Sequence, residues 1–362
     1  MVRSSFVVAL ACATLLLAAC GATAAPPSGS ESTAVASVDP TGPSVGPTAN
    51  QSTPGASAAT LPGLTVQSTI DGITFPAALI ATDDAVWALG HTDATWSRID
   101  PATNAITDTV SIGGSYATGG LLVDGKLWAL DFTDQQVVGV DPATRKVVAK
   151  VPVGIDGGWL VAGDGIMWAI GNDSTELIRI DPKTLAVKRL AVDAACGATP
   201  VAHGASVWMV SGAGHLCRVD PKTGKTLASL DGAGSPHAMF WAADRIFLSN
   251  DEGGVAIVDP VAMSVEAVVP PPPAGTFDGD KYSLSSPGSQ ESVSMLDAGT
   301  AVWVRYTGAT VGRLDLSEPR TWTVYAGLPP SNDGAPMLIA FDSFWVGNVD
   351  VDNVIRAEIP TP

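Results

Sequence analysis

The sequence predicts an all-β protein: a seven-bladed β-propeller closed by an N-terminal strand and preceded by a signal peptide and a disordered linker. Three observations support this prediction. An aromatic residue recurs about every 40 residues, an alternating run ending in an acid follows each one, and an unpaired strand precedes the first repeat while the last repeat lacks its fourth strand. Short strands repeated at this period are typical of propeller blades.

The aromatic residues follow a β-branched or apolar neighbour, and their spacings are 41, 40, 40, 39, 56 and 42 residues. We expect each ring to pack between neighbouring sheets, because aromatic side chains bury the most apolar area. The set comprises Trp87, Trp128, Trp168, Trp208, Phe247, Trp303 and Trp345.

Four strands can be placed in the first repeat, at residues 77–82, 85–90, 96–100 and 105–112. Asp-Pro follows the third strand of five repeats, and this pair suits a type I turn with Asp first and Pro second. We therefore interpret these aspartates as turn residues rather than as catalytic groups. They are Asp100, Asp141, Asp181, Asp220 and Asp259, and Asp315 holds the same place before Leu316.

The two ends of the repeat region complement each other. The last repeat supplies strands at 337–341, 344–348 and 353–358 and then stops, whereas residues 64–70 resemble a fourth strand without a repeat of their own. Pairing these segments would close the ring and remove its exposed edges. The propeller is expected to span residues 63–362, with an insertion at about 270–291 that explains the spacing of 56.

The N-terminus predicts export and lipidation. Residues 1–19 have a positive charge at Arg3 and an apolar run from Phe6 to Ala19. As a helix this run reaches only ~21 Å, which is too short to span a bilayer core of ~30 Å. Leu17-Ala18-Ala19-Cys20-Gly21 resembles the bacterial lipobox, so we expect cleavage before Cys20, lipidation of its thiol, and a cell-membrane protein facing the extracytoplasmic space.

Residues 20–62 form a lipid-anchored linker rich in Pro, Gly, Ser, Thr and Ala, which cannot bury enough apolar surface to fold. The whole chain carries 36 acidic against 19 basic residues, a net charge of -17. This balance excludes nucleic acid as a partner, because phosphates would repel it. The expected partners are the membrane, through the lipid, and an unknown protein, glycan or small molecule; we expect a monomer.

Two cysteines, Cys196 and Cys217, fall inside the repeat region. An even pair in an exported, oxidising setting predicts a disulfide. The spacing does not favour a zinc site, because there is no Cys-x-x-Cys and no paired histidine nearby in sequence.

Function is expected on one face of the ring. The loops joining second to third strands, and those joining fourth strands to the next repeat, share this face, which we call the loop face. An acidic ring with histidines there suggests Mg²⁺ or Ca²⁺, but no metal-binding motif supports this and we expect no cofactor. The candidate binding residues are His91, Asp131, Asp156, Trp159, His215, Asp251, Glu252, Arg305 and Tyr306.

The repeats resemble the YVTN and virginiamycin B lyase (streptogramin lyase) propellers, as in Leu177-Ile-Arg-Ile-Asp181-Pro-Lys-Thr184. The resemblance implies a propeller over about residues 64–358 and, for the lyase branch, metal-assisted elimination by loop-face His and Glu. His237 in Gly234-Ser-Pro-His237 matches a histidine of that branch, but the Trp-Phe-Thr-Glu acid is replaced, as in Trp87-Ala-Leu-Gly. Two hypotheses remain: a non-catalytic binding module, and a metal-dependent lyase or hydrolase with His237 as the catalytic residue.

Overall fold

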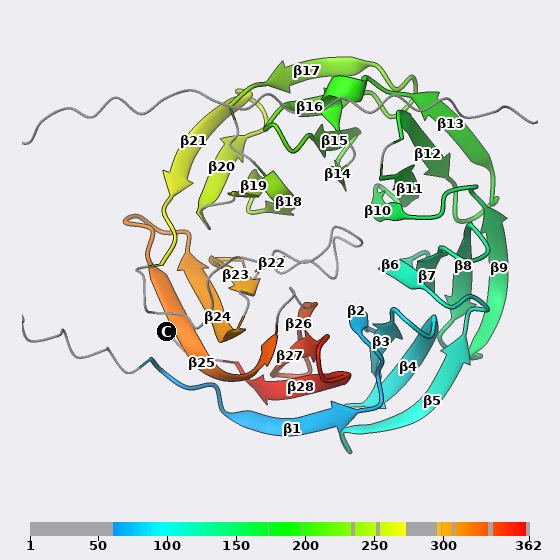
Figure 1. The fold of residues 1–362 in the computed structure, drawn as a ribbon, viewed down its shortest axis with the longest axis vertical. Coiled ribbons are helices and arrows are strands. Elements are labelled where there is room, and N and C mark those ends of the chain that lie inside the picture. Colours follow the sequence, from blue (N-terminus) through cyan, green and yellow to red (C-terminus); the bar gives the residue numbers. More distant parts are fainter. Residues whose placement is uncertain are drawn as a thin grey trace, which may run out of the picture. The chain divides into compact units, whose positions relative to one another are not determined.

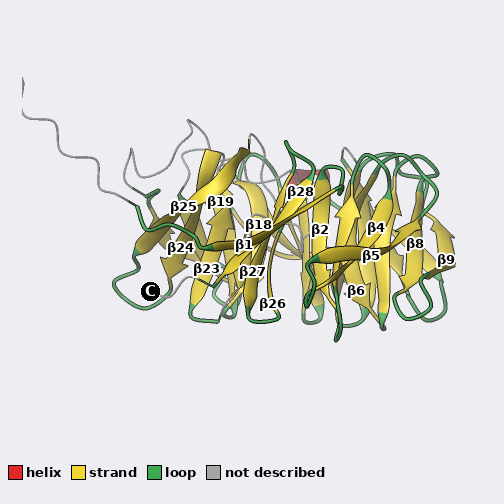
Figure 2. Cartoon of the chain, turned by 90° about the horizontal axis from the view of Figure 1, so that it is seen from below, coloured by secondary structure: helices red, strands yellow, loops and turns green. Residues whose placement is uncertain are grey.

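The computed structural model describes residues 61–172, 174–197, 199–232, 236–250, 254–272, 295–297, 299–305, 308–331 and 336–359. Over these ranges the chain forms seven four-stranded antiparallel sheets. Figure 1 shows the sheets arranged as blades around a ring, and Figure 2 shows loops emerging at both ends of the strands. The predicted seven-bladed all-β propeller is confirmed.

Blades 1 to 3 each use four consecutive strands, with the first nearest the axis and the fourth at the rim (Figure 1). The expected strands of the first repeat differ from the observed ones by no more than one residue at either end. The bounds are β2 (Pro76–Ala81), β3 (Val86–Gly90), β4 (Thr95–Asp100) and β5 (Ala105–Ser111) in blade 1; β6 (Ala117–Val123), β7 (Lys126–Asp131), β8 (Gln136–Asp141) and β9 (Lys146–Pro152) in blade 2; and β10 (Gly158–Gly163), β11 (Ile166–Gly171), β12 (Glu176–Ile180) and β13 (Val187–Ala191) in blade 3.

Blades 4 to 6 repeat this plan. A short 3-10 helix, η1 (Ala194–Cys196), precedes blade 4, and Asp193 caps it by accepting a hydrogen bond from the Ala195 amide at 3.0 Å. The strand bounds are β14 (Thr199–His203), β15 (Ser206–Val210), β16 (Leu216–Val219) and β17 (Thr226–Leu230); β18 (Pro236–Ala242), β19 (Arg245–Asn250), β20 (Val255–Asp259) and β21 (Ser264–Val269); and β22 (Met295–Asp297), β23 (Ala301–Arg305), β24 (Gly308–Asp315) and β25 (Trp322–Ser331).

Blade 7 closes the ring, as predicted. Its strands are β26 (Met337–Ala340), β27 (Ser343–Asn348), β28 (Asn353–Glu358) and, at the rim, β1 (Val66–Asp71). The closing strand begins two residues later than expected and pairs antiparallel with β28, with Ile70 opposite Val354. The predicted signal peptide, Cys20 and nearly all of the linker lie outside the described residues, as does most of the insertion. Within the described part of the chain, no helix is long and apolar enough to cross a membrane.

The repeated aromatic residues fill the spaces between blades, as predicted. Trp128, which is fully buried, packs with Leu160 and Met167 of the next blade. At the closing interface, Trp345 of blade 7 packs against Leu79 and Val86 of blade 1. Burying a large ring at each junction ties every blade to its neighbour through the hydrophobic effect.

The Asp-Pro aspartates hold turns, which confirms their structural interpretation. In blade 3, Asp181 Oδ1 accepts hydrogen bonds from the amides of Lys183 at 2.9 Å and Thr184 at 3.1 Å. These bonds lower the pKa of Asp181, because they stabilise the charged carboxylate. Equivalent amide bonds are made by Asp100, Asp141, Asp220, Asp259 and Asp315.

Candidate functional site

The loop face of blades 1 to 3 is joined by backbone hydrogen bonds from one blade to the next. The amide of Ala117 in blade 2 donates to the carbonyl of His91 in blade 1 at 2.9 Å. The amides of Val153 and Gly154, which lead into blade 3, both donate to the Gln135 carbonyl of blade 2 at 2.9 Å. The three blades therefore present one continuous loop surface.

An aromatic cluster surrounds His91 on this surface. Its ring centroid lies 5.2 Å from that of Phe75, 5.6 Å from Tyr116 and 6.2 Å from Phe132. The Nδ1 atom of His91 donates to the Ala117 carbonyl at 2.7 Å, which fixes the ring. Tyr116 is 52% exposed, and the other three residues are half-buried. We call Phe75, His91, Tyr116 and Phe132 the His91 cluster; only His91 was singled out from the sequence.

Asp131, another predicted binding residue, is fully buried at the end of β7. Its Oδ1 accepts the Thr133 amide at 3.0 Å and the Asp134 amide at 3.2 Å, and its Oδ2 accepts Gln136 Nε2 at 3.1 Å. Gly114 lies against the carboxylate, and a Cβ there would stand 1.9 Å from Oδ1. The carboxylate thus shapes the loop that carries Phe132.

A polar hollow of about 390 Å³ lies beside this loop on blade 3. Exposed Asp156, one of the predicted binding residues, lines it together with Asn172, Ser174, Glu176 and Arg189. Arg189 forms an ion pair with Glu176 at 3.0 Å and donates to the Val153 carbonyl. Trp159, in contrast, is only 8% exposed and packs in the core between blades 3 and 4.

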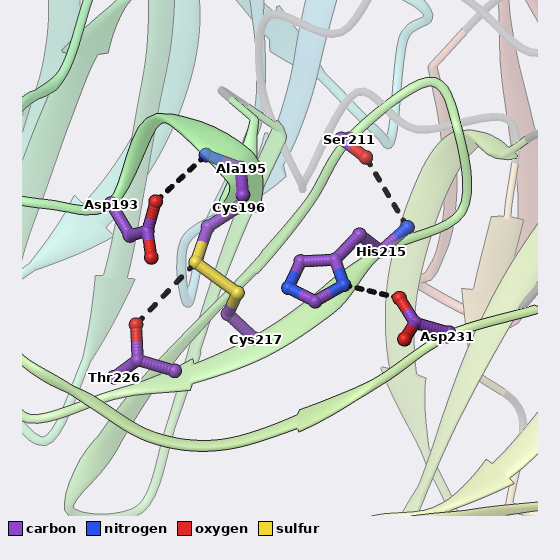
Figure 3. Close-up of a disulfide and its surroundings, with 8 residues drawn as sticks. All are labelled: Asp193, Ala195, Cys196, Ser211, His215, Cys217, Thr226 and Asp231. Carbon is purple, nitrogen blue, oxygen red and sulfur yellow. Dashed lines mark hydrogen bonds and ion pairs between the residues drawn. A yellow bond between two sulfur atoms is a disulfide. The ribbon is translucent and has the colours of Figure 1, made fainter.

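The predicted disulfide between Cys196 and Cys217 is present, with a Cα–Cα distance of 5.4 Å. It joins η1 to β16 in blade 4. His215 lies beside it, and its Nδ1 lies 2.5 Å from Asp231 Oδ1 (Figure 3). Among the described residues, the ligand atoms of Cys196, His215 and Cys217 all lie within 4.8 Å of one another, and this group could hold a metal only with the bridge reduced to two thiols. Sequence spacing did not indicate this cluster.

Arg305, predicted as a binding residue, ends β23 and is 1% exposed. Its guanidinium donates to the Thr310 carbonyl at 2.6 Å and to the Pro329 carbonyl at 3.2 Å. Burial lowers its pKa to about 10, so the group still carries its charge at neutral pH. In the structure it ties together β23, β24 and β25.

The remaining predicted residues are not placed by the structure. His237 lies within β18, but its side chain is outside the described part, and Asp251, Glu252 and Tyr306 lie outside the described residues. Their binding or catalytic roles stay predictions.

Solved structures with the same architecture include two lyases and a WD40 protein. A streptogramin B lyase has a TM-score of 0.63 at 11% identity, covering 81% of this chain and 97% of that chain. A catalytically inactive virginiamycin B lyase from Staphylococcus aureus, with quinupristin, has a TM-score of 0.62 at 12% identity, covering 81% and 99%. The WD40 repeats of RRP9 have a TM-score of 0.63 at 10% identity, covering 82% and 99%.

No protein-family model matches the sequence, and the comparison with curated proteins finds no match. At identities of 10 to 12%, the structural likeness shows the fold and leaves the activity open. The chain is a seven-bladed β-propeller, similar in fold to virginiamycin B lyase, with a disulfide in blade 4.

Proposed function

We propose that this protein is an extracytoplasmic lipoprotein whose propeller binds a neutral, polyhydroxylated ligand such as a glycan on the loop face of blades 1 to 3. The carrying observation is the His91 cluster beside the polar hollow. Aromatic rings pack against the apolar faces of such ligands, and convergent polar groups orient them. The cluster supplies exposed Tyr116, and the hollow supplies Asp156, Asn172 and Glu176.

Continuity between the two features supports a single site. Gln135 follows the loop of Phe132, and its carbonyl accepts both amides that enter the loop lining the hollow. Because the loops are linked through the backbone, the ring surface and the polar groups are held in a fixed relation. A largely pre-formed site loses less conformational entropy on binding.

Charge narrows the class of ligand. Asp134 and Asp156 are exposed on this surface, as is Glu176, and the whole chain carries a net charge of -17. Arg189, the cation of the hollow, is paired with Glu176. An anionic ligand would be repelled, whereas a neutral polyhydroxylated ligand would not.

The proposed function includes a location at the membrane. A lipid on Cys20 would anchor the chain, and the linker to residue 62 would hold the propeller roughly 35–40 Å from the bilayer. A binding module tethered in this way samples ligands of the cell envelope. Mass spectrometry of the membrane fraction tests the anchor, with an acylated N-terminal cysteine as the expected result and an unmodified mature chain as the contrary one.

Binding can be tested by calorimetric titration with a panel of neutral oligosaccharides. We expect at least one to bind, and Tyr116→Ala to weaken it at least tenfold, which corresponds to about 1.4 kcal/mol. Val261→Ala is the matched control, because Val261 is 91% exposed in a turn outside the loop face. Absence of binding across the panel, or equal affinity of the Tyr116 variant, would contradict the proposal.

A further inference from the structure

Two cysteines and one histidine meet at the loop side of blade 4. Cys196 is the last residue of η1, and Cys217 lies in β16. His215 is the loop residue directly before β16. Both cysteines are fully buried, whereas the His215 side chain is 26% exposed. The sulfur and ring-nitrogen ligand atoms all lie within 4.8 Å of one another.

The histidine ring is oriented toward the sulfurs. Asp231 Oδ1 lies 2.5 Å from Nδ1, and Figure 3 shows the other ring nitrogen on the side of the disulfide. The loop is closed as well, because the His215 amide donates to Ser211 Oγ at 3.2 Å and the Ser211 amide donates to the His215 carbonyl at 3.1 Å. A carboxylate on one nitrogen with the other facing a potential metal position is the usual arrangement of a metal-ligating histidine.

We propose that the dithiol form of this chain binds one Zn²⁺ through Cys196 Sγ, Cys217 Sγ and His215 Nε2, with Asp231 orienting the imidazole. Cysteine and histidine suit zinc, which binds sulfur at about 2.3 Å and imidazole nitrogen at about 2.0–2.1 Å. A tetrahedral ion with those bonds places its ligand atoms about 3.5–3.8 Å apart. In the proposed site, rotation of the three side chains brings these atoms, which lie within 4.8 Å of one another in the structure, to those distances.

The site has two forms, a zinc-bound form with reduced cysteines and a metal-free form with the disulfide. Ribosomes release the chain with thiols. Zinc binding passes one proton from each thiol to the solvent, and the two thiolates and the imidazole displace water ligands of hydrated Zn²⁺, with no change of oxidation state. A water molecule completes the fourth position. Disulfide formation takes two electrons and two protons from the same thiols and passes them to a disulfide oxidant, which becomes a dithiol. The two forms exclude each other, so oxidation would release the ion.

The experiment uses the full chain, reduced by a phosphine in denaturant and refolded without oxygen with one equivalent of Zn²⁺. Competition with a chromophoric chelator measures the affinity, and Co²⁺ substitution reports thiolate coordination through its charge-transfer band. The Cys196→Ser/Cys217→Ser variant serves as the control, because it retains Cys12 and Cys20 and so reports any zinc that these two cysteines bind. We expect one more bound Zn²⁺ per wild-type chain than per control chain, and none at this site after reoxidation.

Single variants test the role of each group. His215→Gln should weaken zinc at least tenfold, and Asp231→Asn by about 10–100-fold. His203→Gln is the matched histidine control, because His203 stacks on Trp241 at 3.8 Å and lies in β14 away from the sulfurs. Equal zinc content in wild type and the double serine variant would overturn the proposal. So would an unchanged affinity in His215→Gln, or a reduced chain whose circular dichroism shows no native strand content with zinc.

Discussion

Replacing Trp128 with alanine removes the side chain that fills the space between blades 2 and 3. The indole is fully buried and packs with Leu160 and Met167 across the interface. It also lies on Gly139, where a Cβ would come within 2.8 Å of the ring. Its Nε1 donates to the Val123 carbonyl at 3.1 Å.

The expected loss follows from these contacts. A buried aromatic side chain removes about 150–250 Å² from water, worth about 4–6 kcal/mol at 25 cal/mol per Å². Measured Trp-to-Ala losses of about 3–5 kcal/mol agree with this range. Loss of the hydrogen bond from Nε1 to the Val123 carbonyl adds about 1 kcal/mol. We expect Trp128→Ala to lower the free energy of unfolding by about 4–6 kcal/mol.

Urea denaturation followed by circular dichroism and by tryptophan fluorescence measures this change. Leu227→Ala is the matched control, because Leu227 is 56% exposed on β17, and it should change stability by no more than about 0.5 kcal/mol. A loss below about 1 kcal/mol for Trp128→Ala would refute the role of this ring as an inter-blade wedge.

Three further predictions concern acid, the disulfide and divalent metals. Five turn aspartates have lowered pKa values, chiefly through backbone amides, so their stabilising contribution is present above the unfolded value of about 3.8 and is lost as pH falls through the folded values. The urea concentration at the midpoint of unfolding should therefore fall as the pH is lowered below about 5, and it should fall less steeply in Asp181→Asn. A urea midpoint that does not change with pH in this range would contradict the prediction. Cys196→Ser/Cys217→Ser removes a disulfide between residues 21 positions apart and should lower the free energy of unfolding, measured by urea denaturation, by about 3 kcal/mol. An unchanged free energy of unfolding would show that the disulfide does not stabilise the fold. If the lyase hypothesis holds, Mg²⁺ or Ca²⁺ should raise the melting temperature, EDTA should reverse the rise and His237→Ala should abolish turnover; no shift would count against it.

The fold could be predicted from sequence because each blade repeats the same physical requirements. Each interface between blades needs one large aromatic ring, which explains why an aromatic residue recurs about every 40 residues up to Trp345. Each turn between the third and fourth strands needs an acid to accept its amides, which explains the recurrence of Asp181 and its equivalents. Ring closure followed from an unpaired strand at one end and a missing strand at the other, and β1 pairs with β28 as expected.

The site was less predictable, because loop residues of one type have different environments. Asp131 ends β7 and Asp156 lies in the loop after β9, yet both were expected to bind on the loop face; the first is buried by its own loop and the second lines the hollow. The partners of His91 come from three other loops, so no local pattern indicates the aromatic cluster. The cluster of His215 with the disulfide depends on η1. This turn brings Cys196 next to Cys217, which lies 21 residues later in the sequence, and thus close to His215.

The most direct test of the proposed binding face is photo-crosslinking in living cells. A photoreactive amino acid replaces Tyr116 on the loop face in one strain and Val261, in a turn outside that face, in another; the two native residues are 52% and 91% exposed. We expect a crosslinked, heavier species from position 116 and none from position 261. Crosslinking from position 261 alone, equal crosslinking from both positions, or none from position 116 would contradict ligand binding at the loop face.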